Sequence, residues 1–296
     1  MTGMDLLGSG READVYAIDE RRVLRRYRRG DDVTAEAEIM TYLAGHGYPV
    51  PQVHAASGAD MILERLDGPT MTDAFTAGKL GVDDGAAILV DLHERLHRLP
   101  APSAGLAVPA RSAGLAVPAR SAGLAGPAGP AGLAAPAGLA GLAVPAGLAG
   151  VAVSARSAGL PGVTSGDPGA RRPPSQRNGA SSDRILHRDL HPDNVMLTSR
   201  GPVVIDWHNA AQGRPAVDVC LTAVIMAQVA ASPAHPHAVA AAAFLTAFLN
   251  RTGGEPLDGL DEALEIRRAD PALTATEAAG LAAVVTPLIR GALRPR

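Results

Sequence analysis

The sequence is poor in cysteine, lysine and net charge, and each scarcity excludes a kind of bond, site or binding partner. Cys220 is the only cysteine among 296 residues, so the chain cannot form an internal disulfide and suits a reducing compartment. Lys79 is the only lysine among 27 basic residues, so a site that needs a strong cation must use arginine. The net charge of −3 gives no electrostatic reason to expect nucleic acid or an anionic membrane as a partner.

The sequence also lacks a long hydrophobic run. Its first residues show no basic segment followed by an apolar one, which is the pattern of a signal peptide. The longest apolar stretches that could be helical, about 219–231 and 238–249, fall short of the ~20 residues needed to cross a bilayer. We therefore expect a cytoplasmic protein in which these two stretches form buried helices.

Residues 101–183 differ in composition from the rest of the chain. The nine residues SAGLAVPAR occur twice in tandem, at Ser103–Arg111 and Ser112–Arg120, and glycine and proline recur beyond them. Glycine and proline break helices, and no aromatic residue occurs between Phe75 and Trp207 to form a core. We predict a disordered, low-complexity insertion over 101–183, and we favour a repeat-expanded surface segment over a docking arm.

Two ordered blocks remain, 1–100 and 184–296. Their patterns predict strands at 14–18, 22–27, 53–55, 61–66, 184–186, 195–197 and 203–205. Helical patterns cover 35–44, 85–99 and much of the chain beyond Pro215. Strands followed mostly by helices predict an α+β fold with two lobes. The small sheet lobe is residues 1–66, and the larger helical lobe is 67–100 together with 184–296.

The strongest functional motif is HRDLHPDN at 187–194, followed by VVIDW at 203–207. It matches the kinase catalytic-loop pattern H-R-D-L-x-x-x-N. Phosphoryl transfer needs a carboxylate that orients the attacking hydroxyl, and hard oxygen ligands for magnesium. Asp189 fits the first role, and Asn194 and Asp206 fit the second as Mg²⁺ ligands. The alternative, unrelated turn residues, does not account for the fixed spacing or for the apolar strand before Asp206.

A glycine-bearing turn near the start of the chain supports this interpretation. Gly8, Ser9 and Gly10 begin a match to G-x-G-x-x-G-x-V in which Ala13 replaces the third glycine. Glycines allow backbone N–H groups to approach phosphates closely. The motif is weak when taken alone, because a glycine turn before any strand looks the same. Its place ahead of a strand pair and a catalytic loop favours a phosphate-binding loop.

A charged pair is predicted next to that loop. Arg25 stands in the strand where kinases place a lysine over the phosphates, although a solvated surface arginine is the plain alternative. Glu36 shares a helix face with Met40 and Leu43. A carboxylate on an apolar face is costly unless it is paired. We therefore expect Glu36 to bind Arg25, while Glu38 points to solvent.

Taken together, ILHRDLHPDNVML, VVIDWHNA and GRPAVD resemble the aminoglycoside phosphotransferase family, with I-D-W in place of D-F-G. The resemblance implies a bilobal protein-kinase-like fold that uses ATP (or GTP) and Mg²⁺ to phosphorylate a small-molecule hydroxyl. It also implies backbone contacts to adenine near Glu64 and Leu66. His187 and His191 would shape the catalytic loop, and Asp218 would brace it from a helix start, where an N-cap role is the structural alternative.

A rival motif lies in the helix at 85–99. His93, Glu94 and His97 form H-E-x-x-H, the zinc-peptidase pattern in which the two histidines bind zinc and the glutamate is the general base. No further glutamate follows before Glu255, and no histidine stands at the usual downstream position. A metallopeptidase is therefore a remote alternative, and we interpret the two histidines as packing residues of the helical lobe.

The acceptor cannot be identified from the sequence. A cationic sugar would favour a carboxylate cluster, and the acidic residues Asp258, Asp261, Glu262, Glu265 and Asp270 could supply one. Arg267 and Arg268 interleave with them, which favours a solvated mixed-charge surface. An aminoglycoside or other antibiotic and an amino-alcohol metabolite both stay open as acceptors, as does the oligomeric state. A nucleotide-binding module with weak or no transfer activity is the second functional hypothesis.

Overall fold

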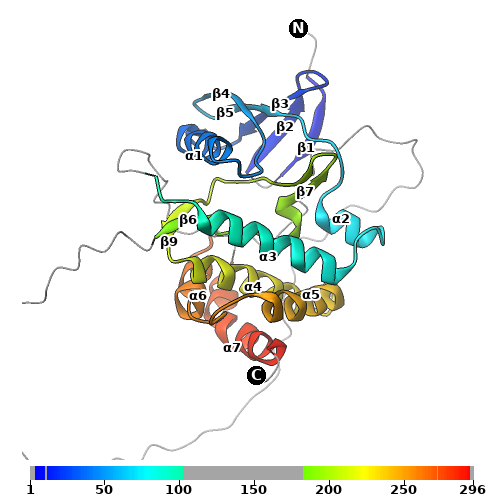
Figure 1. Cartoon of the computed structure of the whole chain (residues 1–296), viewed down its shortest axis with the longest axis vertical. Helices are drawn as coiled ribbons and strands as arrows, with labels where there is room; N and C mark the ends of the chain where they lie inside the picture. Colours follow the sequence, from blue (N-terminus) through cyan, green and yellow to red (C-terminus); the bar gives the residue numbers. More distant parts are fainter. Residues whose placement is uncertain (1–3, 11, 103–182, 272, 294–296) are drawn as a thin grey trace, which may run out of the picture. The chain divides into compact units, whose positions relative to one another are not determined.

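The computed structural model describes residues 4–10, 12–102, 183–271 and 273–293 (Figure 1). The predicted insertion falls almost entirely on residues outside this description. None of the described helices is both long enough and apolar enough to cross a bilayer.

The N-terminal part is a five-stranded antiparallel sheet with the strand order β1-β2-β3-β5-β4. The strands are β1 (Leu6–Ser9), β2 (Ala13–Ala17), β3 (Arg22–Tyr27), β4 (Val53–Ser57) and β5 (Asp60–Glu64). Helix α1 (Thr34–Gly45) connects β3 to β4 and packs against β4. Apolar residues of β3, β5 and α1, such as Val23, Met61 and Ile39, are buried in one core.

The C-terminal part consists mainly of helices, which Figure 1 shows below the sheet. They are α2 (Met71–Thr76), α3 (Val82–Arg98), α4 (Pro215–Ala230), α5 (Ala238–Arg251), α6 (Leu260–Arg268) and α7 (Ala275–Ala292). Helix α4 packs against α5, α6 and α7, and most of its residues are buried. The expectation of a buried helix holds for α4. Only one face of α5 is buried, and Val239 on the other face is 87% exposed.

Short strands hold the loops that carry the functional motif. Strand β6 (Arg184–Leu186) pairs with β9 (Ala211–Gly213), and β7 (Val195–Thr198) pairs with β8 (Gly201–Val204). The HRDLHPDN loop runs from the end of β6 through the 3-10 turn η1 (Pro192–Asn194) into β7. Asp206 follows β8, so the two strand pairs bring both halves of the motif to one place.

The predicted α+β fold is confirmed, and most predicted elements lie within two or three residues of the observed ones. Four elements have no counterpart in the predictions: β1, α2, the 3-10 turn η1 and β9. Strand β5 ends at Glu64, so Leu66 lies in the connection to α2 rather than in a strand. Gly68 in this connection has φ 89°, and a Cβ there would lie 2.1 Å from the Leu197 carbonyl oxygen, so the close contact with β7 requires glycine.

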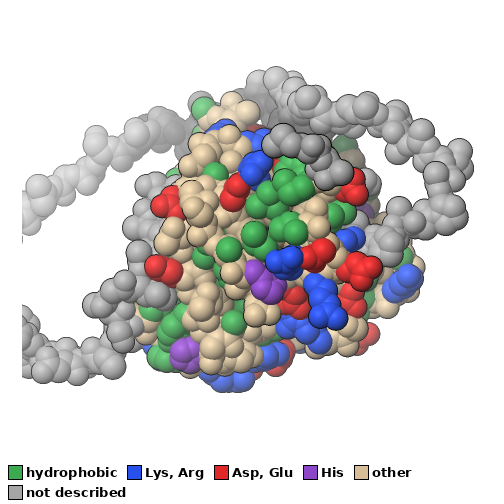
Figure 2. Space-filling view, turned by 90° about the horizontal axis from the view of Figure 1, so that it is seen from above, with side chains coloured by type: hydrophobic (Ala, Val, Ile, Leu, Met, Phe, Trp, Pro, Cys, Tyr) green, Lys and Arg blue, Asp and Glu red, His purple; other side chains and the backbone are tan. Residues whose placement is uncertain are grey.

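Acidic and basic side chains are mixed around a group of hydrophobic side chains on the face seen from above, without a field of one sign (Figure 2). The sheet contributes exposed ion pairs, for example Arg26 with Asp60 at 2.6 Å and Arg28 with Asp14 at 2.6 Å. Such exposed pairs add little to stability.

Candidate active site

Asp189 lies in the loop after β6 and is only 5% exposed. The Asn194 amide Nδ2 donates to the Asp189 carbonyl oxygen at 2.8 Å and lies 3.3 Å from Asp189 Oδ2. Oδ1 is buried and accepts no hydrogen bond within the described residues. A buried carboxylate oxygen without a donor is costly, so its presence here points to a ligand that donates to it.

His191 lies between the carboxylates of Asp189 and Asp193. Its Nε2 lies 3.7 Å from Asp189 Oδ1, and its Nδ1 lies 3.6 Å from Asp193 Oδ2. Burial opposes the charged form of His191, but the two carboxylates outweigh burial and raise its pKa to about 10. The His191 Nδ1 also accepts the Asp193 backbone N–H at 3.3 Å, so His191 caps the turn η1 next to Asp189.

Asp218 anchors the backbone of the same loop. It is completely buried in the first turn of α4, and its two oxygens accept the N–H groups of His187 at 3.0 Å and Arg188 at 2.7 Å. Arg188 has φ 66°, a conformation that non-glycine residues rarely adopt. The bracing interaction is thus present. The N-cap alternative was wrong, because α4 begins at Pro215 with Arg214 as its N-cap.

His187 connects this loop to the strand end that carries Asp206. Its Nδ1 lies 3.2 Å from the Asp189 backbone nitrogen, and its Nε2 lies 3.0 Å from the Ile205 carbonyl oxygen. Because the carbonyl can only accept and the amide can only donate, His187 carries its proton on Nε2 and is neutral. Burial lowers the pKa of His187, which agrees with this tautomer.

Asp206 lies where the sheet meets the catalytic loop, and it also has a positive φ of 68°. Its Oδ1 contacts Arg25 at 2.5 Å and His208 Nδ1 at 2.9 Å. Burial opposes the charged carboxylate, but Arg25 and His208 outweigh burial and hold the pKa of Asp206 well below its usual range. Asp206 is therefore ionised at neutral pH, as a metal ligand must be.

The predicted pair between Arg25 and Glu36 is present, with Nη1 and Oε1 3.2 Å apart. The Tyr27 hydroxyl donates to the other oxygen of Glu36 at 2.7 Å, so the buried carboxylate has partners on both oxygens. The Arg25 guanidinium also lies over the Tyr27 ring at 4.8 Å, and Glu38 is exposed as expected. Arg25 thus bridges Glu36 on α1 and Asp206 after β8.

The glycine-bearing segment forms the turn between β1 and β2. Gly8 and Ser9 belong to β1, and the Gly10 N–H donates to the Ala13 carbonyl at 2.9 Å. A contact that the sequence did not indicate closes this turn against the site: His208 Nε2 lies 3.0 Å from Glu12 Oε2. No local sequence pattern predicts this contact, because nearly 200 residues separate Glu12 from His208.

Glu64 and Leu66 lie at the junction between the sheet and α2. Leu66 is 3% exposed, and the Glu64 backbone N–H donates to the Gln52 carbonyl at 2.8 Å. The Glu64 carboxylate accepts from Arg200, in the turn between β7 and β8, at 2.7 Å. The junction is therefore fixed by side chains as well as backbone, while its role in adenine binding stays a prediction.

The predicted mixed-charge surface near the C-terminus is present, because Asp258, Asp261, Glu262, Glu265 and Arg268 are exposed, but Arg267 and Asp270 do not belong to it. Arg267 is 0% and Asp270 3% exposed, and they form an ion pair with Nη1 and Oδ2 3.3 Å apart. Arg267 also donates to the Gln228 amide oxygen at 2.6 Å. These two residues are therefore part of the helical core rather than of the surface. Asp258 and Glu262 on the surface bind Arg214, so the acidic residues do not gather into a free carboxylate cluster.

A kinase-like fold that joins a glycine-bearing hairpin, a strand cation and a catalytic loop defines a class of phosphoryl-transfer proteins. The sequence model of the phosphotransferase enzyme family matches residues 4–262, and the chain belongs to this family. It is accordingly a small-molecule kinase with an alcohol group as acceptor. No match was found among curated proteins.

Several solved structures resemble the chain at low identity. The gentamicin complex of APH(2″)-IIa is 12% identical, with a TM-score of 0.49, and the match covers 100% of this chain and 92% of that one. The amicoumacin kinase hAmiN, solved with AMP-PNP, Ca²⁺ and its ligand Ami, is 14% identical with a TM-score of 0.49, covering 97% and 88%. The macrolide 2′-phosphotransferase MphH from Brachybacterium faecium is 16% identical with a TM-score of 0.42, covering 99% and 92%.

Proposed function

We propose that this protein transfers the γ-phosphoryl group of ATP to a hydroxyl of a small molecule, either an aminoglycoside-like antibiotic or an amino alcohol. The observation that carries the proposal is the buried Oδ1 of Asp189, which lacks a hydrogen-bond donor within the described residues. The acceptor hydroxyl would donate to this oxygen. Asp218 and His187 fix the loop around it, so the carboxylate is held in place before the acceptor arrives.

The residues around Asp206 fit a magnesium ion. Asp206 is ionised, and Asn194 directs its amide nitrogen toward Asp189, which turns its amide oxygen away from that carboxylate. One carboxylate and one amide oxygen form the donor set that Mg²⁺ takes in kinases. When bound, the ion would neutralise charge on the phosphates. The glycine-bearing turn and Arg25 would bind the phosphates from the sheet side.

In the reaction, the acceptor oxygen attacks the γ-phosphorus and the bond from that phosphorus to the β-phosphate oxygen breaks. The bonding electrons leave with ADP, and the hydroxyl proton passes to Asp189 Oδ1. Arg25 stabilises negative charge on the phosphates, while Glu36 and Tyr27 hold its guanidinium in position. The chain thus supplies mainly orientation and electrostatic stabilisation.

One observation favours a second candidate, a nucleotide-binding module with little transfer activity. Arg25 and His208 both contact the same oxygen of Asp206. A metal ion at Asp206 must compete with these two cations for the negative charge of the carboxylate. A strong Arg25–Asp206 pair would weaken the metal site and slow transfer. The peptidase alternative has no such support, because Glu94 forms an exposed ion pair with Arg98 at 2.7 Å.

The decisive experiment measures thermal unfolding with and without Mg·ATP or Mg·GTP. A ligand that binds only the folded protein adds about 2.7 kcal/mol at a hundredfold excess over Kd. We expect this stabilisation in the wild type and in Asp261→Ala, an exposed carboxylate of α6. Asp206→Ala should lose it. Equal stabilisation of all three proteins would contradict the assigned metal site.

Transfer is then measured as ADP release with amino sugars, macrolides and amino alcohols as acceptors. Acceptor-dependent release that Asp189→Asn abolishes supports the kinase. Nucleotide binding without release across the acceptor panel would favour the binding module.

A further inference from the structure

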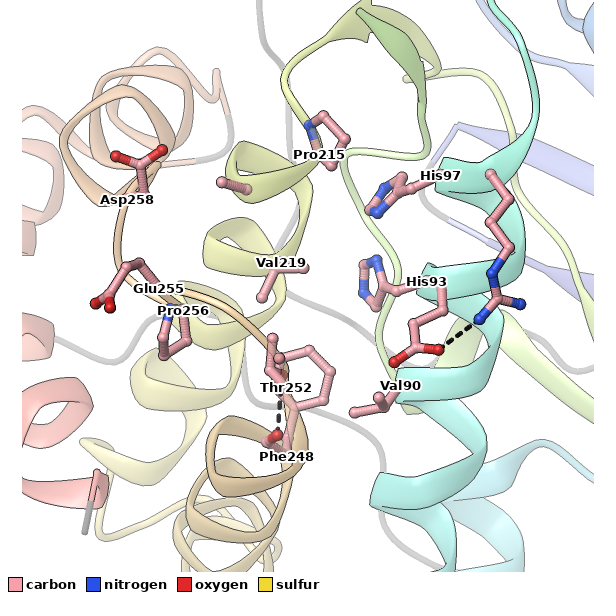
Figure 3. Close-up of a pocket in the computed structure, with 14 residues that line it drawn as sticks. Val90, His93, His97, Pro215, Val219, Phe248, Thr252, Glu255, Pro256 and Asp258 are labelled. Atoms are coloured by element: carbon pink, nitrogen blue, oxygen red, sulfur yellow. Dashed lines mark hydrogen bonds and ion pairs between the residues drawn. The ribbon is translucent and has the colours of Figure 1, made fainter. Parts of the chain in front are cut away.

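A cluster of three possible metal ligands lies outside the proposed phosphotransfer site. His93 and His97 lie one turn apart on α3, and Asp218 faces them from the first turn of α4. One nitrogen from each histidine and one oxygen of Asp218 lie within 4.8 Å of one another. Figure 3 shows both imidazole rings pointing from α3 toward α4, into the space beside Pro215 and Val219.

The hydrogen bonds around His93 determine where its proton lies. Thr222 Oγ1 lies 2.6 Å from the Leu190 carbonyl oxygen, and a carbonyl can only accept. The Thr222 hydroxyl proton is therefore directed to Leu190. Thr222 Oγ1 must in turn accept from His93 Nε2, which lies 3.0 Å away. The neutral His93 ring thus carries its proton on Nε2 and a lone pair on Nδ1.

The lone pair on His93 Nδ1 faces a lone pair of the Asp218 carboxylate. His93 Nδ1 lies 3.7 Å from Asp218 Oδ2 and accepts no hydrogen bond from the described residues, although His93 is only 2% exposed. Two acceptor atoms turned toward each other in a buried site repel, unless a positive charge lies between them. His97 Nε2 lies 3.1 Å from the same oxygen.

We infer that His93 Nδ1, His97 Nε2 and Asp218 Oδ2 bind a divalent transition-metal ion of the Zn²⁺ type. Two imidazoles and a carboxylate suit such ions better than Mg²⁺ or Ca²⁺. Ligand atoms at ~2.0–2.1 Å from a tetrahedral zinc ion lie roughly 3.3 Å apart. The observed 3.1 Å and 3.7 Å separations from Asp218 Oδ2 lie on either side of this distance.

The ion does not need to displace the catalytic loop. A carboxylate offers about four lone-pair positions, and the N–H groups of His187 and Arg188 use two of them. Thr222 supports His93 as the hydrogen-bond partners of metal-bound histidines usually do. His97 must carry its proton on Nδ1 to bind through Nε2, and its ring is partly exposed, so the proton can exchange with solvent.

A fourth ligand can enter from a pocket of about 510 Å³ that borders both histidines. Phe248, Pro256 and Asp258 lie across this pocket in Figure 3. Glu94 is exposed and paired with Arg98, so it is not placed to activate a metal-bound water. The site is therefore structural: the ion would connect α3 to α4 at the carboxylate that anchors the catalytic loop.

The test is a titration of the full chain with Zn²⁺, followed by calorimetry, and with Co²⁺, followed by its visible ligand-field absorption. Excess Mg²⁺ is present to occupy the oxygen ligands of the phosphotransfer site. The variant is His93→Gln, because glutamine can still donate to Thr222 while it lacks Nδ1. The matched control is His54→Gln, at an exposed histidine of β4.

We expect one equivalent of metal to bind wild type and His54→Gln with equal affinity. His93→Gln should bind at least ~100-fold more weakly, since outer-shell changes alone cost 10–100-fold. Equal affinity in His93→Gln would overturn the assignment, and so would a wild type that binds no metal. Should His93→Gln fail to fold, a wild-type Co²⁺ spectrum typical of six oxygen ligands would overturn it equally. Each readout is independent of phosphotransfer.

Discussion

Asp206 and Asp218 are both ionised carboxylates at the motif, but their partners differ in kind. Side chains bind Asp206: Arg25 and His208, which belong to separate elements, and the Asp206 side chain stays 27% exposed. Backbone N–H groups bind both oxygens of Asp218, which is 0% exposed, and His97 is an added side-chain partner of one oxygen. A nucleotide or a metal ion can replace side-chain partners, whereas backbone partners are released only when the loop unfolds. A ligand can therefore rearrange the contacts of Asp206, while the loop held by Asp218 must stay fixed.

The largest expected effect concerns Asp189, which lies in the loop that Asp218 anchors. Asp189→Asn should fold and bind Mg·ATP normally, yet lose about 10²–10⁴-fold in transfer rate, the usual contribution of a general base. Single-turnover phosphotransfer measures the loss, and a nucleotide titration checks binding. An unchanged rate would remove Asp189 from its assigned role.

The comparison itself predicts unequal stabilities. Asp218→Ala should lower the free energy of unfolding by about 3–5 kcal/mol, because two buried backbone donors and His97 lose their acceptor. Asp206→Ala should cost less than about 1 kcal/mol, since Arg25 keeps Glu36 as a partner and solvent reaches the site. Urea unfolding of both variants gives the two values. Similar losses would contradict the distinction.

The reactivity of Cys220 measures whether helix α4, which carries Asp218, stays packed in the folded protein. Burial raises the pKa of its thiol to about 11, and its sulfur lies 3.2 Å from the Pro256 carbonyl oxygen. Below that pKa the thiol is protonated, so at pH 8 the folded protein should react with a disulfide reagent roughly a hundredfold more slowly than the urea-unfolded chain. Equal rates would mean that this helix unpacks readily.

On the Asp206 side, Glu36→Gln should weaken Mg·ATP binding about tenfold, because an amide holds Arg25 less strongly than a carboxylate. The matched control is Glu38→Gln on the exposed face of α1. Isothermal titration measures both affinities. A similar decrease in the control would show a general effect on the helix rather than loss of the Arg25 contact.

The smallest effect is expected from shortening residues 103–182. Helix α3 packs against β6, so the described residues on either side of this segment belong to neighbouring elements. For a flexible closing loop, halving its length changes the free energy of unfolding by about 0.6 kcal/mol. Urea unfolding and the Mg·ATP-dependent shift should both stay close to wild type. A large loss of either would show that the segment contributes to the fold or the site.

The sequence predicted the features that a local spacing encodes. The catalytic loop and the strand end at Asp206 are short and continuous, so their backbone geometry is visible as a pattern. Strand β1 was missed because Gly8 within it and Gly10 after it indicate a turn rather than a strand. The contact of Glu12 with His208 and the burial of Arg267 depend on elements that meet only in the folded chain. Asp218 was predicted to anchor the loop, but not to face His93.

The position of Trp207 gives the protein an intrinsic optical probe. It is the only tryptophan of the chain and is fully buried beside Asp206. The centroids of its ring and the His187 ring are 4.6 Å apart in an edge-on contact. Its indole N–H donates to the Val204 carbonyl at 3.1 Å. Its fluorescence therefore comes from a single position that contacts the catalytic loop. Any rearrangement of His187 or of the Asp206 strand end will change that emission directly, without a label.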